Sequence, residues 1–300
     1  MATRREFLQA TAAATLAGCT GTSVTREKNA TPVVDTHLHC FAGPTDPRFP
    51  YHKDAPYRPD APATPERLVE LMDGAGVDHA IVVHPEPYQD DHRYLEHCLE
   101  VGGKKLKGTC LFFAGRDAGM NELVKRLPIV AARIHAYAPE RLPPFGKPEL
   151  RALWKRIADL GLMVQLHFEP RHAPGFEPLI REFPDTTVIV DHLGRPLQGT
   201  PEEHAVVVGW GKLKNTVIKL SAFAPETQYP HRDIAPVIRR LADAFGPDRM
   251  ISGGGFDEKA TAASYRAARE KARSFIGHSS ADDQAKVLGG TAARLFRFHA

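Results

Sequence analysis

The stretch Val33-Val34-Asp35-Thr36-His37-Leu38-His39-Cys40 places two histidines two residues apart at the end of an apolar run. In a β-strand, residues two apart share one face, so Asp35, His37 and His39 are predicted to point the same way. The two histidines are either metal ligands in an active site or polar side chains where a strand meets solvent. A His-x-His pair alone does not decide between these alternatives, so the decision depends on residues elsewhere in the chain.

Further apolar, β-rich runs follow this stretch and alternate with helical patterns. The eight predicted strands cover residues 33–39, 79–85, 106–112, 130–136, 162–168, 187–193, 216–223 and 249–253. The predicted helices include 65–74, 91–101, 150–159, 233–245 and, at the end of the chain, 281–298. Several strands are apolar nearly throughout, as a parallel sheet buried on both faces requires. Eight strand–helix repeats without a glycine-rich dinucleotide motif predict a single-domain α/β fold, a (β/α)8 TIM barrel with a C-terminal helix.

The composition is that of a globular protein. The chain has 300 residues, of which 42% are hydrophobic and 25% charged, and its formal net charge is +3. This charge is too small to indicate nucleic-acid binding, and no apolar run is long enough to predict a membrane-spanning helix. The four cysteines, Cys19, Cys40, Cys98 and Cys110, are widely spaced, so a disulfide framework is not expected.

The N-terminal residues do not follow the barrel pattern. Thr3-Arg4-Arg5-Glu6-Phe7-Leu8 resembles a twin-arginine export signal, and the apolar stretch behind it ends in Leu16-Ala17-Gly18-Cys19, which resembles a bacterial lipobox. We therefore expect residues 1–18 to be a signal peptide, Cys19 to receive lipid, and residues 19–31 to tether the barrel of residues 32–300. The expected location is the periplasm, either free or anchored to the membrane by the lipid. Cleavage without lipidation and a frayed alanine-rich helix are the alternatives.

Polar side chains gather at the ends of the predicted strands. In TIM barrels the active site lies at the C-terminal ends of the strands. The residues at these ends are His37, His39, His84, Arg133, His135, His167, His192, Lys219 and Ser221. Imidazoles that converge from several strands suit Zn²⁺ or a similar divalent ion. Two other histidines, His97 and His204, lie away from the strand ends and are expected at the surface.

Taken together, these residues resemble the amidohydrolase superfamily, in its amidohydrolase-related branch. The matching segments are Asp35-Thr36-His37-Leu38-His39, Gln165-Leu166-His167, Asp191-His192-Leu193-Gly194-Arg195-Pro196 and Lys219-Leu220-Ser221. The branch includes lactonases that act on 2-pyrone-4,6-dicarboxylate or on sugar lactones, and some decarboxylases. The resemblance runs from Val33 to about Phe298. It implies that His37, His39 and His167 bind a metal, with His192 near the metal or the substrate.

The resemblance also implies an aspartate after the eighth strand, as a metal ligand or general base. The corresponding position here is Gly255, and Asp257 follows two residues later. Either the loop folds back so that Asp257 reaches the site, or the usual base is missing. The catalytic candidates are therefore Asp257 and then His192, whereas Asp191 alternates away from His192 and is expected to orient a neighbour or cap the loop. Because the fourth strand lacks the lysine that bridges two metals in binuclear relatives, one divalent ion, most readily zinc, or a metal-free site is expected.

The predicted activity is hydrolysis of a small lactone, ester or amide that carries a carboxylate, by a water molecule that the metal activates. The predicted substrate contacts are Arg133, His135, His84, Lys219, Ser221 and Arg195. A buried ion pair, for instance with Asp35, is the alternative for Arg133 and Lys219. Two other functions stay open: a non-oxidative decarboxylase on the same scaffold, and a catalytically dead, ligand-binding barrel lipoprotein.

Overall fold

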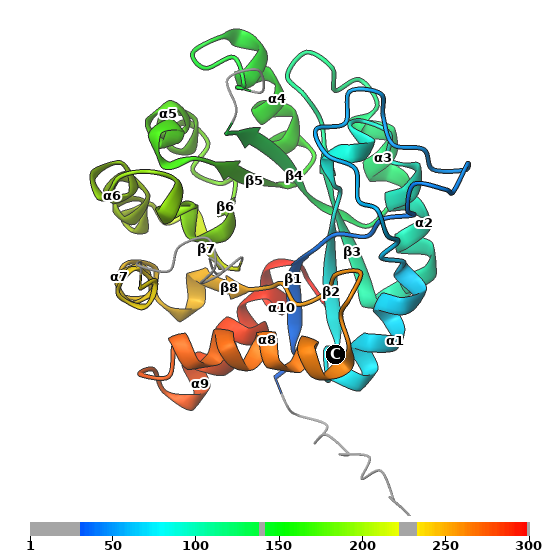
Figure 1. Ribbon diagram of the computed structural model, residues 1–300. Helices are drawn as coiled ribbons and strands as arrows, with labels where there is room; N and C mark the ends of the chain where they lie inside the picture. The colour runs from blue at the N-terminus through cyan, green and yellow to red at the C-terminus, as the bar shows by residue number, and fades with distance from the viewer. Residues whose placement is uncertain (1–30, 138–141, 222–232, 299–300) are drawn as a thin grey trace, which may run out of the picture. The chain divides into compact units, whose positions relative to one another are not determined.

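Eight parallel strands that pair in chain order form the centre of the protein, and helices surround them (Figure 1). The structure, a computed structural model, describes residues 31–137, 142–221 and 233–298. Within Thr31–Ala300 the chain is one compact unit. The arrangement confirms the predicted (β/α)8 barrel. The predicted signal peptide, Cys19 and most of the tether lie outside the described residues.

All eight strands lie where the apolar runs predict them. They are β1 Val34–Leu38, β2 His79–Val83, β3 Leu106–Leu111, β4 Ile129–Ala136, β5 Met163–Phe168, β6 Val188–Val190, β7 Thr216–Leu220 and β8 Met250–Ser252. Strand β6 is shorter than predicted, because the backbone leaves the extended conformation after Val190. This early end has consequences for the site described below.

The helices confirm the predicted ones to within two residues at most boundaries. They are α1 Pro65–Ala75, α2 Arg93–Gly102, α3 Met120–Arg126, α4 Pro148–Asp159, α5 Ala173–Glu182, α6 Pro201–Gly209, α7 Ala235–Phe245, α8 Ala262–Phe275, α9 Ala281–Ala285 and α10 Thr291–Leu295. Local signals set the ends: the Thr64 side chain accepts from Arg67 N at the start of α1, and Gly76 ends α1 in the left-handed conformation. No helix among the described residues is both long and apolar enough to cross a bilayer.

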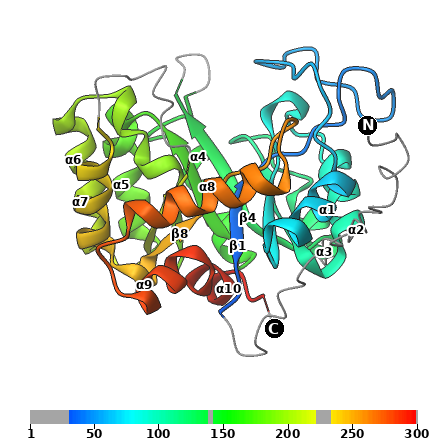
Figure 2. The same ribbon diagram turned by 60° about the horizontal axis from the view of Figure 1, so that its bottom comes forward.

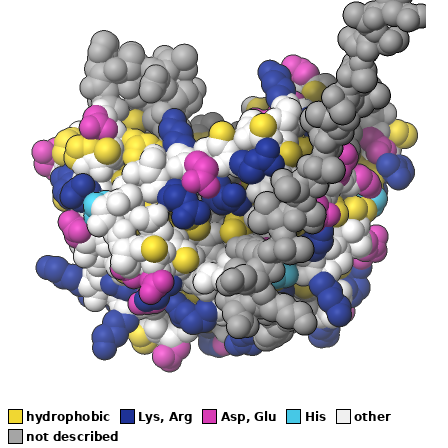
Figure 3. All heavy atoms as spheres, turned by 90° about the horizontal axis from the view of Figure 1, so that it is seen from below, with side chains coloured by type: hydrophobic (Ala, Val, Ile, Leu, Met, Phe, Trp, Pro, Cys, Tyr) yellow, Lys and Arg dark blue, Asp and Glu magenta, His cyan; other side chains and the backbone are white. Residues whose placement is uncertain are grey.

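The apolar core has two parts. One fills the lower barrel interior with side chains such as Val34, Ile81 and Ile251, and Phe296 from the C-terminal segment closes it from beneath. The other lies between the strands and the surrounding helices, and the buried, free Cys40 belongs to it. With the lower end filled by apolar side chains, the polar residues are left to the C-terminal ends of the strands. Acidic and basic side chains are mixed on the face in Figure 3, as the small net charge suggests.

The prediction of one continuous helix over residues 281–298 is wrong. A π-helical turn, Lys286–Gly290, separates α9 from α10, and its Gly289 has φ 176° and ψ −39°. A Cβ atom on Gly289 would lie 1.8 Å from the Pro32 carbonyl oxygen. The helix therefore breaks where the chain passes the start of β1 at backbone contact distance.

Side chains bridge the seam between β1 and β8. Thr36 Oγ1 donates to Ser252 O at 2.8 Å, and Gly254 N donates to Asp35 Oδ1 at 2.8 Å. Helix α8 crosses outside this seam (Figure 2), and its Tyr265 hydroxyl donates to Asp35 Oδ2 at 2.7 Å. The last strand and the helix behind it thus hold the first strand in place.

The prediction that Asp35 shares a face with His37 and His39 is wrong. Asp35 reaches outward to Tyr265 on α8, and the pairing of β1 with β2 shifts register between Asp35 and Leu38. An irregularity of this kind inserts an extra residue and reverses the alternation of side chains. Of the three polar residues in this alternation, only His37 and His39 therefore reach the histidine side of the barrel interior.

Candidate active site

Five histidine rings form a continuous group at the C-terminal ends of the strands. The ring centroid of His37 lies 5.1 Å from that of His39 and 4.4 Å from that of His192. The His167 ring lies 5.2 Å from His192 and 5.1 Å from His135. Strands β1, β4 and β5 and the turn after β6 supply these rings. The structure therefore brings together five of the predicted site histidines.

Asp191 lies beside this imidazole group, between donors of β4 and β5 and the ammonium of Lys219 on β7. Its Oδ2 accepts from Arg133 Nε at 2.9 Å and from Gln165 Nε2 at 3.0 Å, and its Oδ1 lies 3.0 Å from Lys219 Nζ. The side chains of Asp191 and Lys219 are both 0% exposed and that of Arg133 is 4% exposed. Arg133 and Lys219 thus form the buried ion pair that was the alternative to substrate binding, with Asp191 as the partner instead of Asp35.

The prediction that Asp191 points away from His192 is wrong, because the backbone after β6 is not extended. His192 has φ 53° and ψ 44°, Leu193 has φ 60°, and Arg195 has φ 53°. Successive left-handed residues turn the chain sharply, so both Asp191 and His192 reach the site. Such conformations cost about 1–3 kcal/mol each for residues other than glycine and concentrate at functional sites. The carboxylate at the end of an apolar strand in the Asp-His motif was the signal that could have identified Asp191.

Burial keeps the imidazoles neutral. Burial lowers the pKa of His39 to about 4 and that of His192 to about 3. It also lowers the pKa values of His37 and His167 well below the usual histidine value, and nearby cations add to the effect. At neutral pH these rings therefore offer lone pairs, which suits metal binding.

For the pKa of Asp191, neighbouring charges outweigh burial. Burial opposes its ionisation, but the charges of Lys219 and Arg133 outweigh burial and hold the pKa of Asp191 well below the ordinary aspartate value. The site therefore contains one fixed carboxylate, two fixed cations and several neutral imidazoles.

One group of donors among the described residues fits a metal ion. Donor atoms of His37, Asp191 and His192 all lie within 4.8 Å of one another. Neutral imidazole and carboxylate are donors that zinc and similar ions accept. Lys219 Nζ lies 3.3 Å from His37 Nδ1 and 3.0 Å from Asp191 Oδ1, so a positive charge stands beside two of the three donors and opposes an ion at this position. The group could hold one ion at most.

This donor group shares only His37 with the ligand set implied by the resemblance. His39 Nδ1 donates to Val83 O at 2.7 Å, a bond that leaves the other ring nitrogen as an acceptor and fixes the ring, as in many metal-binding histidines. His167 Nδ1 instead lies 3.4 Å from His135 Nδ1. The two rings are near the donor group, but their nitrogens do not converge with it.

Two further predicted contacts lie at the edge of the group. Ser221 Oγ and His192 Nδ1 are 2.8 Å apart, so the hydroxyl orients the imidazole. The guanidinium of Arg195 lies 5.6 Å from the ring centroid of Tyr137. Ser221 thus contacts an imidazole of the group directly, and Arg195 lies next to it through Tyr137, whose ring is 5.1 Å from that of His167.

His84 is not part of the site. On β2, Ile81 and Val83 face the barrel interior, so alternation turns His84 outward. Its Nε2 donates to Gln89 O at 2.9 Å, and its ring packs 4.4 Å from that of His92. The structure therefore does not bring His84 to the imidazole group.

Asp257 is also outside the group. It is exposed, and its Oδ1 accepts from Lys259 N at 2.8 Å in a surface turn. The glycines after β8 do not fold it back, because Gly253 and Gly254 instead pack against the backbone of β1. The structure therefore does not bring the predicted base to the imidazoles.

The prediction of a surface position for His204 is wrong. His204 is buried, and its Nε2 donates to Leu193 O at 2.7 Å, which holds the left-handed turn after β6. His97 is half-buried beside Glu66, with Nε2 and Oε1 3.4 Å apart.

Sequence reasoning missed two residues beside His135. Glu86 is buried, its Oε1 lies 3.5 Å from His135 Nδ1, and its other oxygen accepts from the Tyr137 hydroxyl. Both follow strand ends in segments without a motif, so nothing in the sequence marked them.

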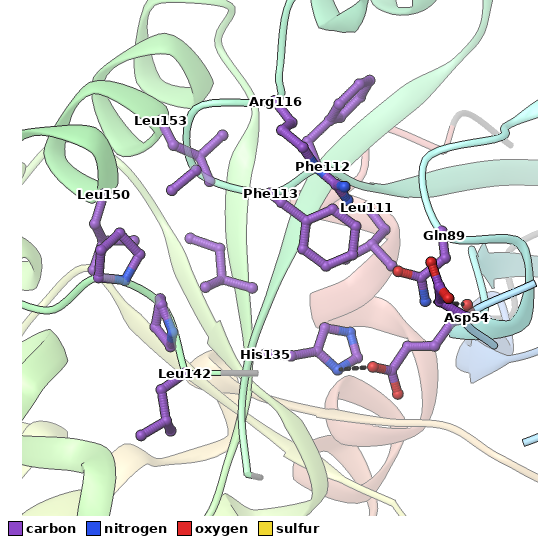
Figure 4. Close-up of a pocket in the computed structure, with 15 residues that line it drawn as sticks. Asp54, Gln89, Leu111, Phe112, Phe113, Arg116, His135, Leu142, Leu150 and Leu153 are labelled. Atoms are coloured by element: carbon purple, nitrogen blue, oxygen red, sulfur yellow. Dashed lines mark hydrogen bonds and ion pairs between the residues drawn. The ribbon is translucent and has the colours of Figure 1, made fainter. Parts of the chain in front are cut away.

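A cavity of about 460 Å³ opens beside His135 (Figure 4). The segment after β3, the residues just before α4 and α4 itself supply most of its wall, including Phe112, Phe113, Leu150 and Leu153. The imidazole group therefore has an adjoining space of ligand size.

Comparison with known proteins gives relatives over most of the chain. The chain is 30% identical over 237 residues to a 2-pyrone-4,6-dicarboxylate hydrolase of Comamonas testosteroni, covering 73% of this chain and 75% of the relative. It is 28% identical over 262 residues to an L-fucono-1,5-lactonase of Burkholderia ambifaria, covering 78% and 84%.

Solved structures share the fold at lower identity. A probable 2-pyrone-4,6-dicarboxylic acid hydrolase from Acinetobacter baumannii, with citric acid bound, aligns with a TM-score of 0.71 at 21% identity over 88% of this chain and 99% of that one. A zinc-bound amidohydrolase from Burkholderia multivorans aligns with a TM-score of 0.64 at 17% identity, over 89% of this chain and 99% of that one. A manganese-bound dihydroxybenzoic acid decarboxylase from a Polaromonas species aligns with a TM-score of 0.59 at 14% identity, over 89% of this chain and 97% of that one.

The amidohydrolase family model matches residues 34–298, which is the whole barrel. With this match and a relative at 30% identity, the predicted resemblance is confirmed. The chain belongs to the amidohydrolase family and is a hydrolase.

Proposed function

We propose that this hydrolase opens a lactone or cleaves a small ester at the imidazole group above Asp191. The observation that carries the proposal is the convergence of His37 and His192 on one buried carboxylate, Asp191, which Arg133 and Lys219 hold in its ionised form. The names of the relatives, a 2-pyrone-4,6-dicarboxylate hydrolase and an L-fucono-1,5-lactonase, support lactones as the substrate class.

His37, Asp191 and His192 would hold one divalent ion, with zinc the ion that best suits these donors. When bound, it lowers the pKa of a water molecule and polarises the substrate carbonyl. In this form His167, whose ring lies 5.2 Å from that of His192, is placed to accept the proton of the water. Without an ion, His192 itself is the base, oriented by Ser221 at its Nδ1.

Arg195 is the candidate for binding a substrate carboxylate. Its guanidinium stands over the Tyr137 ring at the edge of the group, on the side from which a substrate would approach. A guanidinium binds a carboxylate through two parallel hydrogen bonds. An anionic group at the open side of the site therefore remains part of the proposal.

We expect purified full-length protein to contain about one divalent ion per chain, and the His37→Ala variant to contain none. Loss of one of three ligands removes affinity, and we expect hydrolysis to fall at least about 100-fold. Elemental analysis and lactone hydrolysis measure the two effects. The control is His97→Ala, since His97 is half-buried beside Glu66 and lies outside the donor group. Unchanged metal content and full activity in His37→Ala would contradict the site assignment.

A second candidate function is a non-oxidative decarboxylase. It is favoured by the lack of a carboxylate at Gly255 and by the shared fold of the manganese-bound decarboxylase. Product analysis separates the candidates, because a lactonase releases acid without carbon dioxide. Ligand binding without either product would support the dead, ligand-binding barrel.

We also propose that the chain is exported and lipidated. The support is the order of the twin-arginine-like and lipobox-like segments in residues 1–19. In a bacterium with twin-arginine export, we expect a fatty-acid label on the parent chain, no label on Cys19→Ser, and cytoplasmic retention of the Arg4→Lys/Arg5→Lys variant. An unlabelled, processed parent would indicate cleavage without lipidation, and an unprocessed parent would contradict export.

A further inference from the structure

We propose that the cavity beside His135 binds an apolar acyl or aryl group of the substrate. This inference rests on the proposed function, because it names the substituent that the hydrolysed lactone or ester carries. An enzyme of this kind recognises an apolar part of its substrate in addition to a substrate carboxylate.

The cavity adjoins the imidazole group directly. His135 lines it, and His135 Nδ1 lies 3.4 Å from His167 Nδ1, whose ring neighbours His192. Glu86 lines the same end and lies 3.5 Å from His135. A substrate with its carbonyl at the imidazoles thus has His135 at the entrance to the cavity.

The wall away from His135 is made of apolar side chains. Phe112, Ile134, Leu150 and Leu153 line it and are themselves buried. Figure 4 shows Leu150 and Leu153 on the side opposite Asp54 and Gln89. An apolar group is stabilised by burial against Leu150 and Leu153. The opposite side, with Asp54 and Gln89, suits water or a polar part of the ligand.

Leu142 carries the apolar lining of the cavity out to the surface. It lines the cavity and is 39% exposed. Its side chain is therefore available at the mouth of the cavity to contact a ligand.

Charge disfavours a carboxylate in this cavity. Asp54 and Glu86 both line it, and its one arginine, Arg116, stacks 4.6 Å from the Phe113 ring and pairs with Asp90 at 3.8 Å. An anion would therefore meet two acidic side chains and a cation already engaged. A substrate carboxylate belongs at Arg195, on the imidazole side.

The size of the cavity sets the size of the group. Its 460 Å³ is about three times the roughly 150 Å³ of an apolar cavity that holds benzene. A chain of about six carbons or a phenylalkyl group fits within this volume. Each methylene that it buries strengthens binding about fourfold.

The test uses methyl ketones, which keep the carbonyl of an ester and cannot be hydrolysed. We expect 2-octanone to bind the full-length protein at least about 30-fold more tightly than 2-butanone, since it adds four methylenes that are mostly buried. Ligand-detected NMR titration measures both dissociation constants. Equal affinities for the two ketones would overturn the proposal.

Variants locate the binding. Ala114→Phe fills the cavity and Leu142→Gln makes its mouth polar, and each is expected to weaken 2-octanone binding about tenfold. Leu142 is exposed, so its substitution carries little folding risk. The matched control is Ala152→Phe on the exposed face of α4, which should bind 2-octanone like the parent. Parent-like affinity in both cavity variants would overturn the proposal.

Turnover separates this inference from the proposed function. If 2-octanone binds as expected but no lactone or ester is hydrolysed, the cavity assignment stands and the proposed function fails. If hydrolysis occurs but octanoate esters are cleaved no faster than acetate esters, the proposed function stands and the cavity does not bind the substituent.

Discussion

Replacing Asp191 with asparagine is expected to lower the free energy of unfolding by about 3–5 kcal/mol and to abolish hydrolysis. The substitution leaves Arg133 and Lys219, both almost fully buried, without the carboxylate that balances them. An uncompensated buried charge costs several kcal/mol, because the ion has lost its hydration without a partner. Urea denaturation followed by circular dichroism measures the change.

Two further variants test the cause of this loss. Asp191→Asn/Lys219→Met removes one of the orphaned cations, and we expect it to recover at least about 1 kcal/mol relative to the single variant. Asp257→Asn changes an exposed aspartate and should alter stability by less than about 0.5 kcal/mol. If Asp191→Asn is as stable as the parent, Asp191 does not hold the interior of the site together.

Acid is expected to destabilise the fold in a range where most proteins are stable. Burial lowers the pKa values of a set of histidines: His37, His39, His84, His92, His167 and His192. As the pH falls below 6.5, the unfolded chain binds protons at these positions, whereas the folded chain binds them only at lower pH, with pKa values of about 4 for His39 and His92 and about 3 for His192. Stability is therefore fully present above pH 6.5 and declines as the pH falls through this range.

The size of the acid effect follows from the same shifts. The pKa of His39 falls from 6.5 to about 4, which corresponds to about 3 kcal/mol once the pH is below both values. Each histidine contributes up to about 1.4 kcal/mol per pH unit, so several together give a steep slope. Denaturant unfolding at pH 8, 7, 6 and 5 measures it.

The control for this slope is a histidine outside the site. His84 packs against the His92 ring and does not touch the donor group, so His84→Phe should flatten the slope without removing metal. Stability that stays constant from pH 8 to pH 5.5 in the parent would contradict the prediction, since the histidines would then be protonated equally in both states.

The fold was predictable because its signals are local and repeated. Apolar runs that alternate with amphipathic segments fix eight strands and their order, and the barrel then brings His37, His167 and His192 to one end. Alternation along β2 would have turned His84 outward as well, had it been applied there. The histidine group could therefore be predicted from the sequence.

The failures share a different cause, which is backbone irregularity. A register shift in β1 turns Asp35 away from the site, and left-handed residues after β6 turn Asp191 into it. Gly289 breaks the last helix because of a contact with Pro32, more than 250 positions away in sequence. Glu86 enters through a loop whose path depends on packing. Such features depend on tertiary contacts, which strand and helix periodicity do not contain.

The bridged seam between β1 and β8 determines when the site can exist during synthesis. Thr36 bonds to Ser252 and Asp35 to Gly254 and Tyr265, so the strand that carries His37 and His39 is completed by residues made more than 200 positions later. Contacts so distant in sequence form late, because the chain between them must first be brought together. A ribosome-bound fragment that ends before β8 would therefore have the histidines of β1 on an unpaired edge. Catalytic competence should appear in one step, only after nearly the whole chain has left the ribosome.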